Sequence, residues 1–256
     1  MMQEKPTVLI TGASRGVGAA AARFAAGFGA NVVLTARRLD LLQAGADRIN
    51  TTGGAALAVA AELSREDDCQ DVIRHALSRF GRIDGLVNCG GIIDPIARIA
   101  AANFREWEYN WAVNVLGPLM LTTLALPHLR ETRGRVINIS SGAAARAVQG
   151  WGAYSVSKAA LNHLTRVLAV EEPDITALAV RPGRVNTDMQ VAVREKGRGV
   201  MAPEAHSQYV EQFEQGQLLP PEKPGRAAAW MALYAPHEWS GEFIEWNDPR
   251  MPQFED

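Results

Sequence analysis

The residues with the clearest chemistry are a tyrosine and a lysine four positions apart, Tyr154 and Lys158. The surrounding segment has a helical pattern, and residues at i and i+4 lie on one face of a helix, so the ammonium can lie near the phenol. A free tyrosine has a pKa of about 10 and is a poor acid or base at neutral pH unless a nearby cation stabilises its phenolate. The pair therefore favours acid–base chemistry at the Tyr154 hydroxyl.

A second candidate site is the glycine-rich run TGASRGVG, from Thr11 to Gly18. It follows a short β-rich apolar run and opens a helical pattern. Glycines allow positive φ and close approach of the backbone to a diphosphate, and a helix N-terminus offers free N–H groups to the anion. A purely structural turn is the alternative reading, but the position in the first strand–turn–helix unit favours a nucleotide site.

The sequence contains seven apolar runs that are candidate strands, and helical patterns alternate with them. These elements position the glycine turn and the Tyr154–Lys158 pair. Strands that are apolar on both faces and alternate with helices favour a parallel sheet covered on both sides. We therefore predict a single doubly wound α/β domain of Rossmann type over residues 1–256, with a seven-stranded, mostly parallel sheet. The predicted strands are 7–11, 31–35, 55–61, 85–89, 135–139, 175–180 and 242–246, and the main helices are 18–28, 39–49, 65–80, 104–129 and 153–170.

Composition limits the possible partners. Lys plus Arg total 26 against 28 Asp plus Glu, a net charge of −2, and no basic stripe is visible, so nucleic acid is not expected. The two cysteines, Cys69 and Cys89, and the five histidines lack ligand or disulfide spacing. No metal is therefore expected, and a reducing cytoplasm fits. Neither a signal peptide nor a membrane span is expected, because residues 113–129 include Asn114, two prolines and His128.

Five elements together resemble the short-chain dehydrogenase/reductase family. They are the TGxxxGxG turn, Asn114 on a helix, a serine 13 positions before the tyrosine, the YxxxK pair and a Pro-Gly turn after the sixth strand, and the resemblance spans residues 7–246. It implies that Tyr154 protonates a carbonyl oxygen during reduction and that Ser141 polarises the same oxygen. It also implies that Lys158 holds the nicotinamide ribose and that Asn114 fixes a proton-relay water.

The second predicted strand ends in Ala36, Arg37 and Arg38, where an NAD-preferring enzyme usually has an acidic residue. Arg37 can stack on adenine and bind a 2′-phosphate, and Arg15 can approach the same phosphate. We therefore predict NADPH/NADP⁺ as the cofactor. Arg38 is interpreted as a solvated residue at a helix start.

The resemblance also assigns further cofactor contacts, with departures from the family pattern. Cys89 and Gly90 stand where the family usually has Asn and Ala, and Cys89 is interpreted as a packed strand residue rather than a reactive thiol. Thr187 matches a position that binds the nicotinamide carboxamide, and it can also cap a helix. The predicted cofactor-binding residues are Gly12, Ser14, Arg15, Gly16, Val17, Gly18, Arg37, Glu62, Leu63, Cys89, Gly90, Gly91, Tyr154, Lys158, Pro182, Gly183, Val185 and Thr187.

Three segments look most like the sepiapterin-reductase/benzil-reductase-like branch: EEPDIT, AVRPGRVNTDMQ and SGEFIEWNDPR. That resemblance implies an NADPH-dependent carbonyl reductase acting on a small ketone or vicinal diketone, assembled as a homodimer or homotetramer through its long helices. One alternative is an NADP-dependent alcohol dehydrogenase working in the oxidative direction. The other is a non-catalytic NADPH-binding regulator, which the retention of Asn114, Ser141, Tyr154 and Lys158 disfavours.

Residues 188–219 interrupt the strand–helix rhythm with a polar stretch at the carboxyl edge of the sheet, where open α/β folds bind ligands. We predict a mobile cover over the nicotinamide, and a solvated surface excursion is the alternative. The apolar residues expected to select the substrate are Met189, Val193, Val200, Met201 and Phe213.

Overall fold

The computed structural model describes residues 5–254 and contains a seven-stranded sheet in the order β3-β2-β1-β4-β5-β6-β7. Every neighbouring pair of strands is parallel, which confirms the predicted doubly wound sheet. β1, β2, β5 and β6 consist largely of buried residues, as expected for a sheet covered on both faces. The strands are β1 (Thr7–Thr11), β2 (Asn31–Ala36), β3 (Ala55–Ala60), β4 (Gly85–Asn88), β5 (Arg135–Ile139), β6 (Thr176–Arg181) and β7 (Phe243–Glu245).

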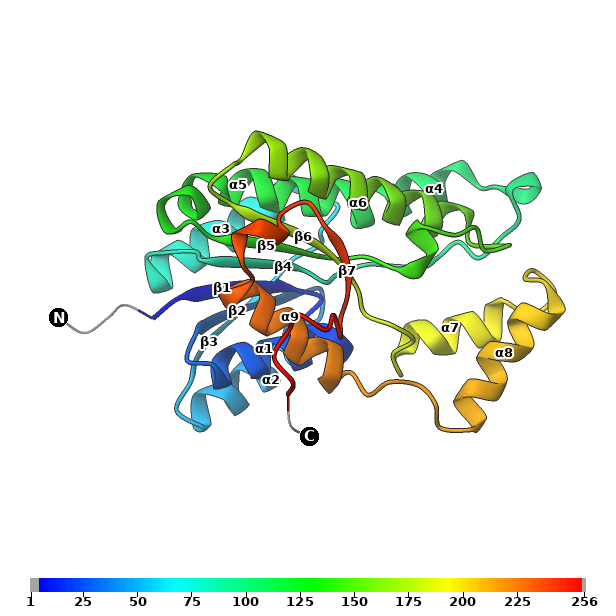
Figure 1. The fold of residues 1–256 in the computed structure, drawn as a ribbon, viewed down its shortest axis with the longest axis horizontal. Helices are drawn as coiled ribbons and strands as arrows, with labels where there is room; N and C mark the ends of the chain where they lie inside the picture. Colours follow the sequence, from blue (N-terminus) through cyan, green and yellow to red (C-terminus); the bar gives the residue numbers. More distant parts are fainter. Residues whose placement is uncertain (1–4, 255–256) are drawn as a thin grey trace.

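Two layers of helices cover the sheet (Figure 1). One face packs against α1 (Gly16–Gly27), α2 (Leu39–Thr51) and α9 (Glu222–Tyr234), and the other against α3 (Glu66–Phe80), α5 (Gly117–Thr132) and α6 (Gly152–Glu171). α1 and α9 lie in close contact, since a Cβ added at Gly225 would lie 2.5 Å from the Ala20 Cβ. Small residues at this contact bring the first and last helices together beneath β1.

The strand order reverses between β1 and β4, because the chain continues outward through β2 and β3 and then returns to pair β4 with β1. In open α/β sheets, ligands bind in the crevice outside the carboxyl ends of the strands at such a point. The glycine turn after β1 and the loop after β4 therefore meet at the predicted site.

The predicted helix over residues 104–129 is one continuous helical run with a change of winding inside it. α4 (Phe104–Trp111) passes into a π-helical turn, Ala112–Leu116, which leads directly into α5. By length and composition the whole run, Phe104–Thr132, could cross a membrane, with a mean hydropathy of 1.4, but half of that window is buried inside the fold. Core helices of globular proteins meet the same criterion, so the run carries weak evidence for a membrane span.

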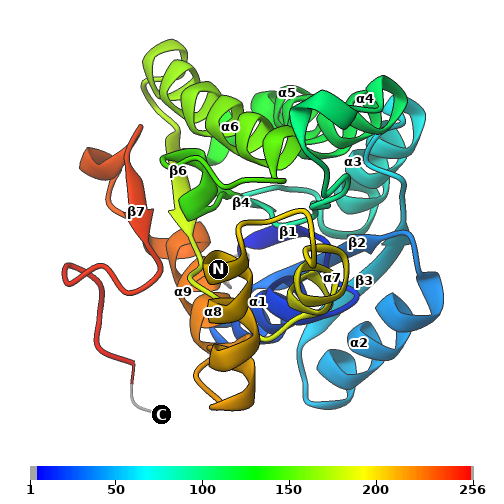
Figure 2. The same cartoon turned by 90° about the vertical axis from the view of Figure 1, so that its right-hand side faces the viewer.

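The segment after β6 is an inserted pair of helices, α7 (Asp188–Lys196) and α8 (Pro203–Glu214). Figure 2, which views the molecule from the right of Figure 1, shows both helices in front of the carboxyl ends of the strands. The base of the insertion is closed by two hydrogen bonds, from Asn186 N to the Leu219 carbonyl (2.8 Å) and from Leu219 N to the Arg184 carbonyl (2.8 Å). We call residues 188–219 the helical cover.

Candidate active site

The glycine turn is locked against the loop that follows β4. Thr11 Oγ1 accepts hydrogen bonds from the backbone N–H groups of Cys89 (2.9 Å) and Gly90 (2.8 Å). Gly12 has φ +66°, and a Cβ there would lie 2.8 Å from the Gly90 Cα. Both glycines are therefore required by close backbone approach, and Gly12 is also required by its conformation. No side chain caps the N-terminus of α1, so the first N–H groups of this helix can bind an anion.

One cavity of about 700 Å³ extends from this turn to Tyr154. It is lined by every predicted cofactor-binding residue except Gly18, and by Ser141. Gly18 packs behind the turn, because a Cβ there would lie 2.4 Å from the Gly12 carbonyl oxygen. Asn114 is fully buried and also lies outside the lining, next to Gly91. The free helix N-terminus, the close-packed glycines of the turn and the extent of the cavity fit a nicotinamide dinucleotide, and Arg15 and Arg37 line the same cavity.

Tyr154 and Lys158 are both buried on α6, as the helical spacing predicted. Lys158 Nζ donates to the Ile139 carbonyl at 2.8 Å and lies 5.8 Å from the centre of the Tyr154 ring. Burial raises the pKa of Tyr154 to about 12, although a hydrogen bond with Ser141 opposes the rise. The stabilisation of the phenolate that the sequence favoured does not decide the direction of this shift, because loss of water around the phenol is its largest cause.

Lys158 responds to the same burial in the opposite sense. Desolvation lowers the pKa of its ammonium from 10.5 to about 8. Ser141 also lines the cavity, and it precedes a short 3₁₀ turn. Its Oγ accepts a hydrogen bond from Ala143 N at 3.1 Å, which fixes the position of the hydroxyl. At neutral pH this arrangement presents a protonated phenol, a fixed hydroxyl and a cation in one place, which can protonate and polarise a carbonyl oxygen.

Asn114 holds the loop after β4 against α6. Its Oδ1 accepts from Ile92 N (2.9 Å), and its Nδ2 donates to the Ile92 carbonyl (2.8 Å), to Asn110 Oδ1 (3.1 Å) and to Ser157 Oγ (3.1 Å). It lies in the π-helical turn, a rare geometry that often occurs at functional sites. Asn110 and Ser157 were not among the predicted site residues. Asn110 precedes Asn114 by one helical turn, a signal that could have found it.

The arginines predicted to bind the 2′-phosphate lie at the far end of the cavity. Arg37 Nη1 is 3.3 Å from the Tyr109 hydroxyl and 3.8 Å from Glu62, and its side chain is 61% exposed. Tyr109, which the sequence analysis also missed, donates to Glu62 Oε2 at 3.2 Å. No local pattern could have found it, because α4 brings it to the site from a distant part of the chain. Arg15 forms an ion pair with Asp188 of the helical cover.

Arg38 and Thr187 also have defined partners. Arg38 binds Asp40 at 2.7 Å on the surface at the start of α2, which agrees with its interpretation as a solvated residue. Thr187 precedes α7 in the capping position, but its hydroxyl makes no cap and lies 3.4 Å from the Val185 carbonyl. Its Oγ1 is therefore not committed to the helix. Cys89 is a packed thiol whose pKa burial raises to about 12, so it lacks the thiolate character of a reactive cysteine.

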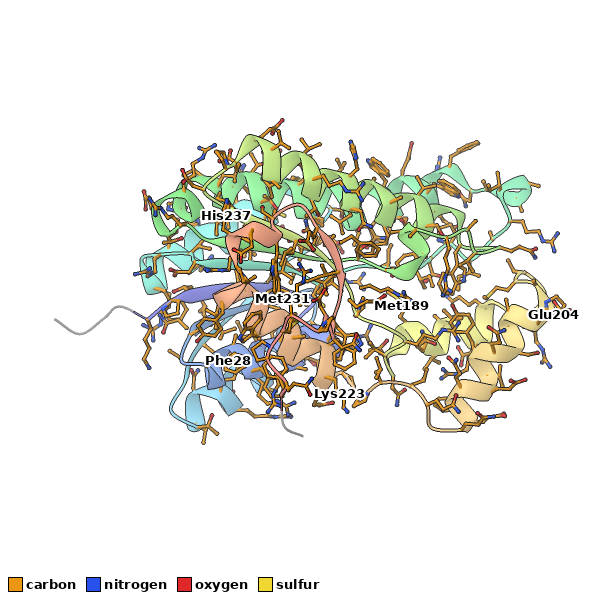
Figure 3. The ribbon with its side chains drawn as sticks, in the orientation of Figure 1. Phe28, Met189, Glu204, Lys223, Met231 and His237 are labelled. Carbon is orange, nitrogen blue, oxygen red and sulfur yellow. The ribbon has the colours of Figure 1, made fainter. Side chains whose placement is uncertain are left out.

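Of the five apolar residues of the helical cover that were predicted to select the substrate, two line the cavity. Met189 and Val193 line it, and Figure 3 places Met189 near the start of α7, toward the sheet. Val200, Met201 and Phe213 do not line it. Phe213 is 47% exposed and lies under Arg194, whose guanidinium carbon is 3.9 Å from the ring centre. Tyr209, one helical turn earlier in α8, is 5% exposed and lines the cavity.

Tyr209 and Tyr154 belong to a small apolar cluster that joins the helical cover to the rest of the domain. Trp151 lies between the two, with its ring centre 6.0 Å from that of Tyr154 and 5.5 Å from that of Tyr209. The cavity beside Tyr154 therefore has an aromatic and aliphatic wall. Among residues 5–254, no group of three or more His, Cys, Asp or Glu side chains is placed to hold a metal ion.

The chain is similar to known oxidoreductases. Residues 6–198 match the model of the family described as short chain dehydrogenase. An uncharacterized oxidoreductase of Schizosaccharomyces pombe is 35% identical over 247 residues, covering 94% of this chain and 96% of that protein. A benzil reductase ((S)-benzoin forming) of Saccharomyces cerevisiae is 29% identical and covers 95% of this chain and 97% of its own length. A solved blue fluorescent protein from a metagenomic library, in complex with NADPH, matches with a TM-score of 0.82 at 26% identity over 94% of this chain and 95% of that one. The chain belongs to the short-chain dehydrogenase/reductase family.

Proposed function

We propose that this oxidoreductase is an NADPH-dependent carbonyl reductase of small ketones or vicinal diketones, with Tyr154 as the general acid. The observation that carries the proposal is a single cavity that joins the glycine turn and Arg37 to Tyr154 and Ser141. Bound NADPH would supply the hydride. The chain's own residues would bind the dinucleotide along the turn, polarise the carbonyl oxygen through Ser141 and deliver the proton from Tyr154.

The protonation state of Tyr154 supports the reductive direction. A phenol whose pKa is raised to about 12 carries its proton at neutral pH, which is the form that a general acid needs. Oxidation of an alcohol would require the phenolate, which burial disfavours. The benzil reductase relative supports a carbonyl substrate, and the NADPH complex of the solved structure supports this cofactor.

The direct test follows NADPH absorbance with a panel of aldehydes, ketones and diketones, using wild type and Tyr154→Phe. Loss of the acid should lower turnover by about 10² to 10⁴ while NADPH binding stays nearly intact. Tyr234→Phe is the matched control, because this half-exposed tyrosine lies on α9 and is absent from the cavity lining. Undiminished turnover in Tyr154→Phe would show that another group is the acid.

Cofactor preference is tested by titrating NADPH and NADH against wild type and Arg37→Ala. Charged hydrogen bonds contribute roughly 1.5 to 3 kcal/mol each, so we expect at least about a tenfold preference for NADPH that falls in the variant. Arg38→Ala is the matched control, since its guanidinium is bound to Asp40. Equal wild-type affinities for the two cofactors would contradict the proposal.

We also propose a cytoplasmic homodimer or homotetramer. Both cysteines are free, which suits a reducing compartment. Apolar side chains remain exposed along α4, α5, α6 and the π-helical turn, a surface that a second copy could cover. A monomeric mass by light scattering at micromolar concentration would contradict this assembly. The exposed residues are Trp111 (40%), Leu116 (41%), Leu119 (38%), Val156 (51%), Val167 (36%) and Val170 (82%).

A further inference from the structure

Two polar side chains in the cavity are buried without a hydrogen-bond partner. Within residues 5–254, seven buried side-chain nitrogen or oxygen atoms lack a partner. Of the residues that carry them, Trp151 and Gln190 are the two that line the cavity. Trp151 is 6% exposed and Gln190 is 9% exposed. Because an unpaired buried polar group is costly, each such group in a folded protein calls for an explanation.

Trp151 lies beside the proposed catalytic acid, and Gln190 lines the same cavity. Trp151 directly precedes α6, and its indole packs edge-on against Tyr154, with an interplanar angle of 84° and a centroid separation of 6.0 Å. Gln190 lies in the first turn of α7, where its backbone N–H donates to the Thr187 carbonyl at 2.9 Å. Its side chain makes no hydrogen bond with any described residue, so its amide can turn either its oxygen or its NH₂ toward a ligand.

Several other groups of the lining are apolar or already paired. Met189 and Val193 are apolar, and the Arg184 guanidinium stacks on the Tyr209 ring at 4.3 Å. The two carboxylates of the lining, Glu62 and Asp188, are engaged by Arg37 and Arg15. Trp151 and Gln190 are therefore the described lining residues whose buried side-chain polar atoms lack a partner.

We propose that Trp151 and Gln190 form a subsite that binds a second oxygen of the substrate, next to the carbonyl that Tyr154 protonates. The inference rests on the proposed function and specifies its substrate class. Trp151 is a donor only, so its partner must be an acceptor, which in a carbonyl substrate is an oxygen. Because its ring packs on Tyr154, that acceptor must lie close to the reacting carbonyl, as in a vicinal dicarbonyl or an α-hydroxy ketone. The second oxygen is bound and keeps its bonds, so the subsite adds no redox step.

The experiment compares two substrates that differ in that oxygen. Benzil carries two adjacent carbonyls, and deoxybenzoin has the same two phenyl rings with one carbonyl. We measure the ratio of their kcat/KM values with NADPH for wild type, Trp151→Phe, which keeps an aromatic ring, and Gln190→Met, which keeps the length. A net hydrogen bond of about 0.5 to 1.5 kcal/mol corresponds to roughly 2- to 13-fold, so each variant should lower the benzil-to-deoxybenzoin ratio by that factor.

Thr35→Val is the matched control. Its hydroxyl is also buried and unpartnered, but Thr35 lies in β2 and is absent from the cavity lining, so the ratio should stay at the wild-type value. NADPH affinity should also be unchanged in Gln190→Met, and its Tm should not fall, because no hydrogen bond is lost. The subsite is overturned if either cavity variant slows both substrates by the same factor. It is also overturned for Gln190 if NADPH binding weakens instead. Failure of the wild type to reduce either substrate would count against the proposed function itself.

Discussion

Gly12→Ala tests whether the cofactor turn depends on close backbone approach or only on a positive φ. Gly12 has φ +66°, and the added methyl would lie 2.8 Å from Gly90 Cα and 2.9 Å from Gly90 N. The left-handed conformation costs an alanine about 1 to 2 kcal/mol, and overpacking against backbone adds about 1 to 3 kcal/mol. The sum is about 2 to 5 kcal/mol. For a domain of this size each kcal/mol lowers Tm by about 2 to 4 °C, so the expected fall is about 4 to 20 °C.

Gly81→Ala separates the two contributions. Gly81 ends α3 with φ +75°, and a Cβ there would meet no atom within 4 Å, so this variant should show only the conformational cost of about 1 to 2 kcal/mol. Thermal unfolding gives both Tm values, and NADPH titration by fluorescence shows whether the loop after β4 has moved. NADPH affinity should fall in Gly12→Ala and not in Gly81→Ala. Equal losses of Tm with unchanged NADPH affinity would refute the close-approach argument.

Further predictions concern pH and the helical cover. Because burial lowers the pKa of Lys158 to about 8, its ammonium is lost as the pH rises through that value, whereas Tyr154, with a pKa of about 12, stays protonated. The kcat/KM for ketone reduction should therefore decline above about pH 8, and a flat profile to about pH 10 would contradict this. Met189→Ala should change the preference among ketones, and Phe213→Ala should not, because only Met189 of the two lines the cavity. Hydrogen exchange in residues 188–219 should slow when NADP⁺ and a ketone are added. An exchange rate that is the same with and without these ligands would show that the segment is a surface excursion and not a cover.

Features set by neighbouring residues could be predicted from the sequence. The apolar runs locate the strands, since a strand buried on both faces leaves a local composition signal. The i,i+4 spacing places Tyr154 and Lys158 on one face of α6, because helical geometry is fixed over a single turn. The glycine turn was found for the same reason. The turn connects the end of a strand to the start of a helix, and both elements lie within a few residues of it in the sequence.

Features that depend on distant residues or on the amount of buried volume were decided by the tertiary structure. Tyr109 reaches Glu62 and Arg37 only because α4 packs near the ends of β2 and β3. Phe213 and Tyr209 have similar local sequence surroundings, but the docking of α8 decides which of them faces the cavity. The pKa of Tyr154 is the clearest case. The sequence supplied the nearby lysine, whereas the direction of the shift follows from how completely the assembled domain removes water from the phenol.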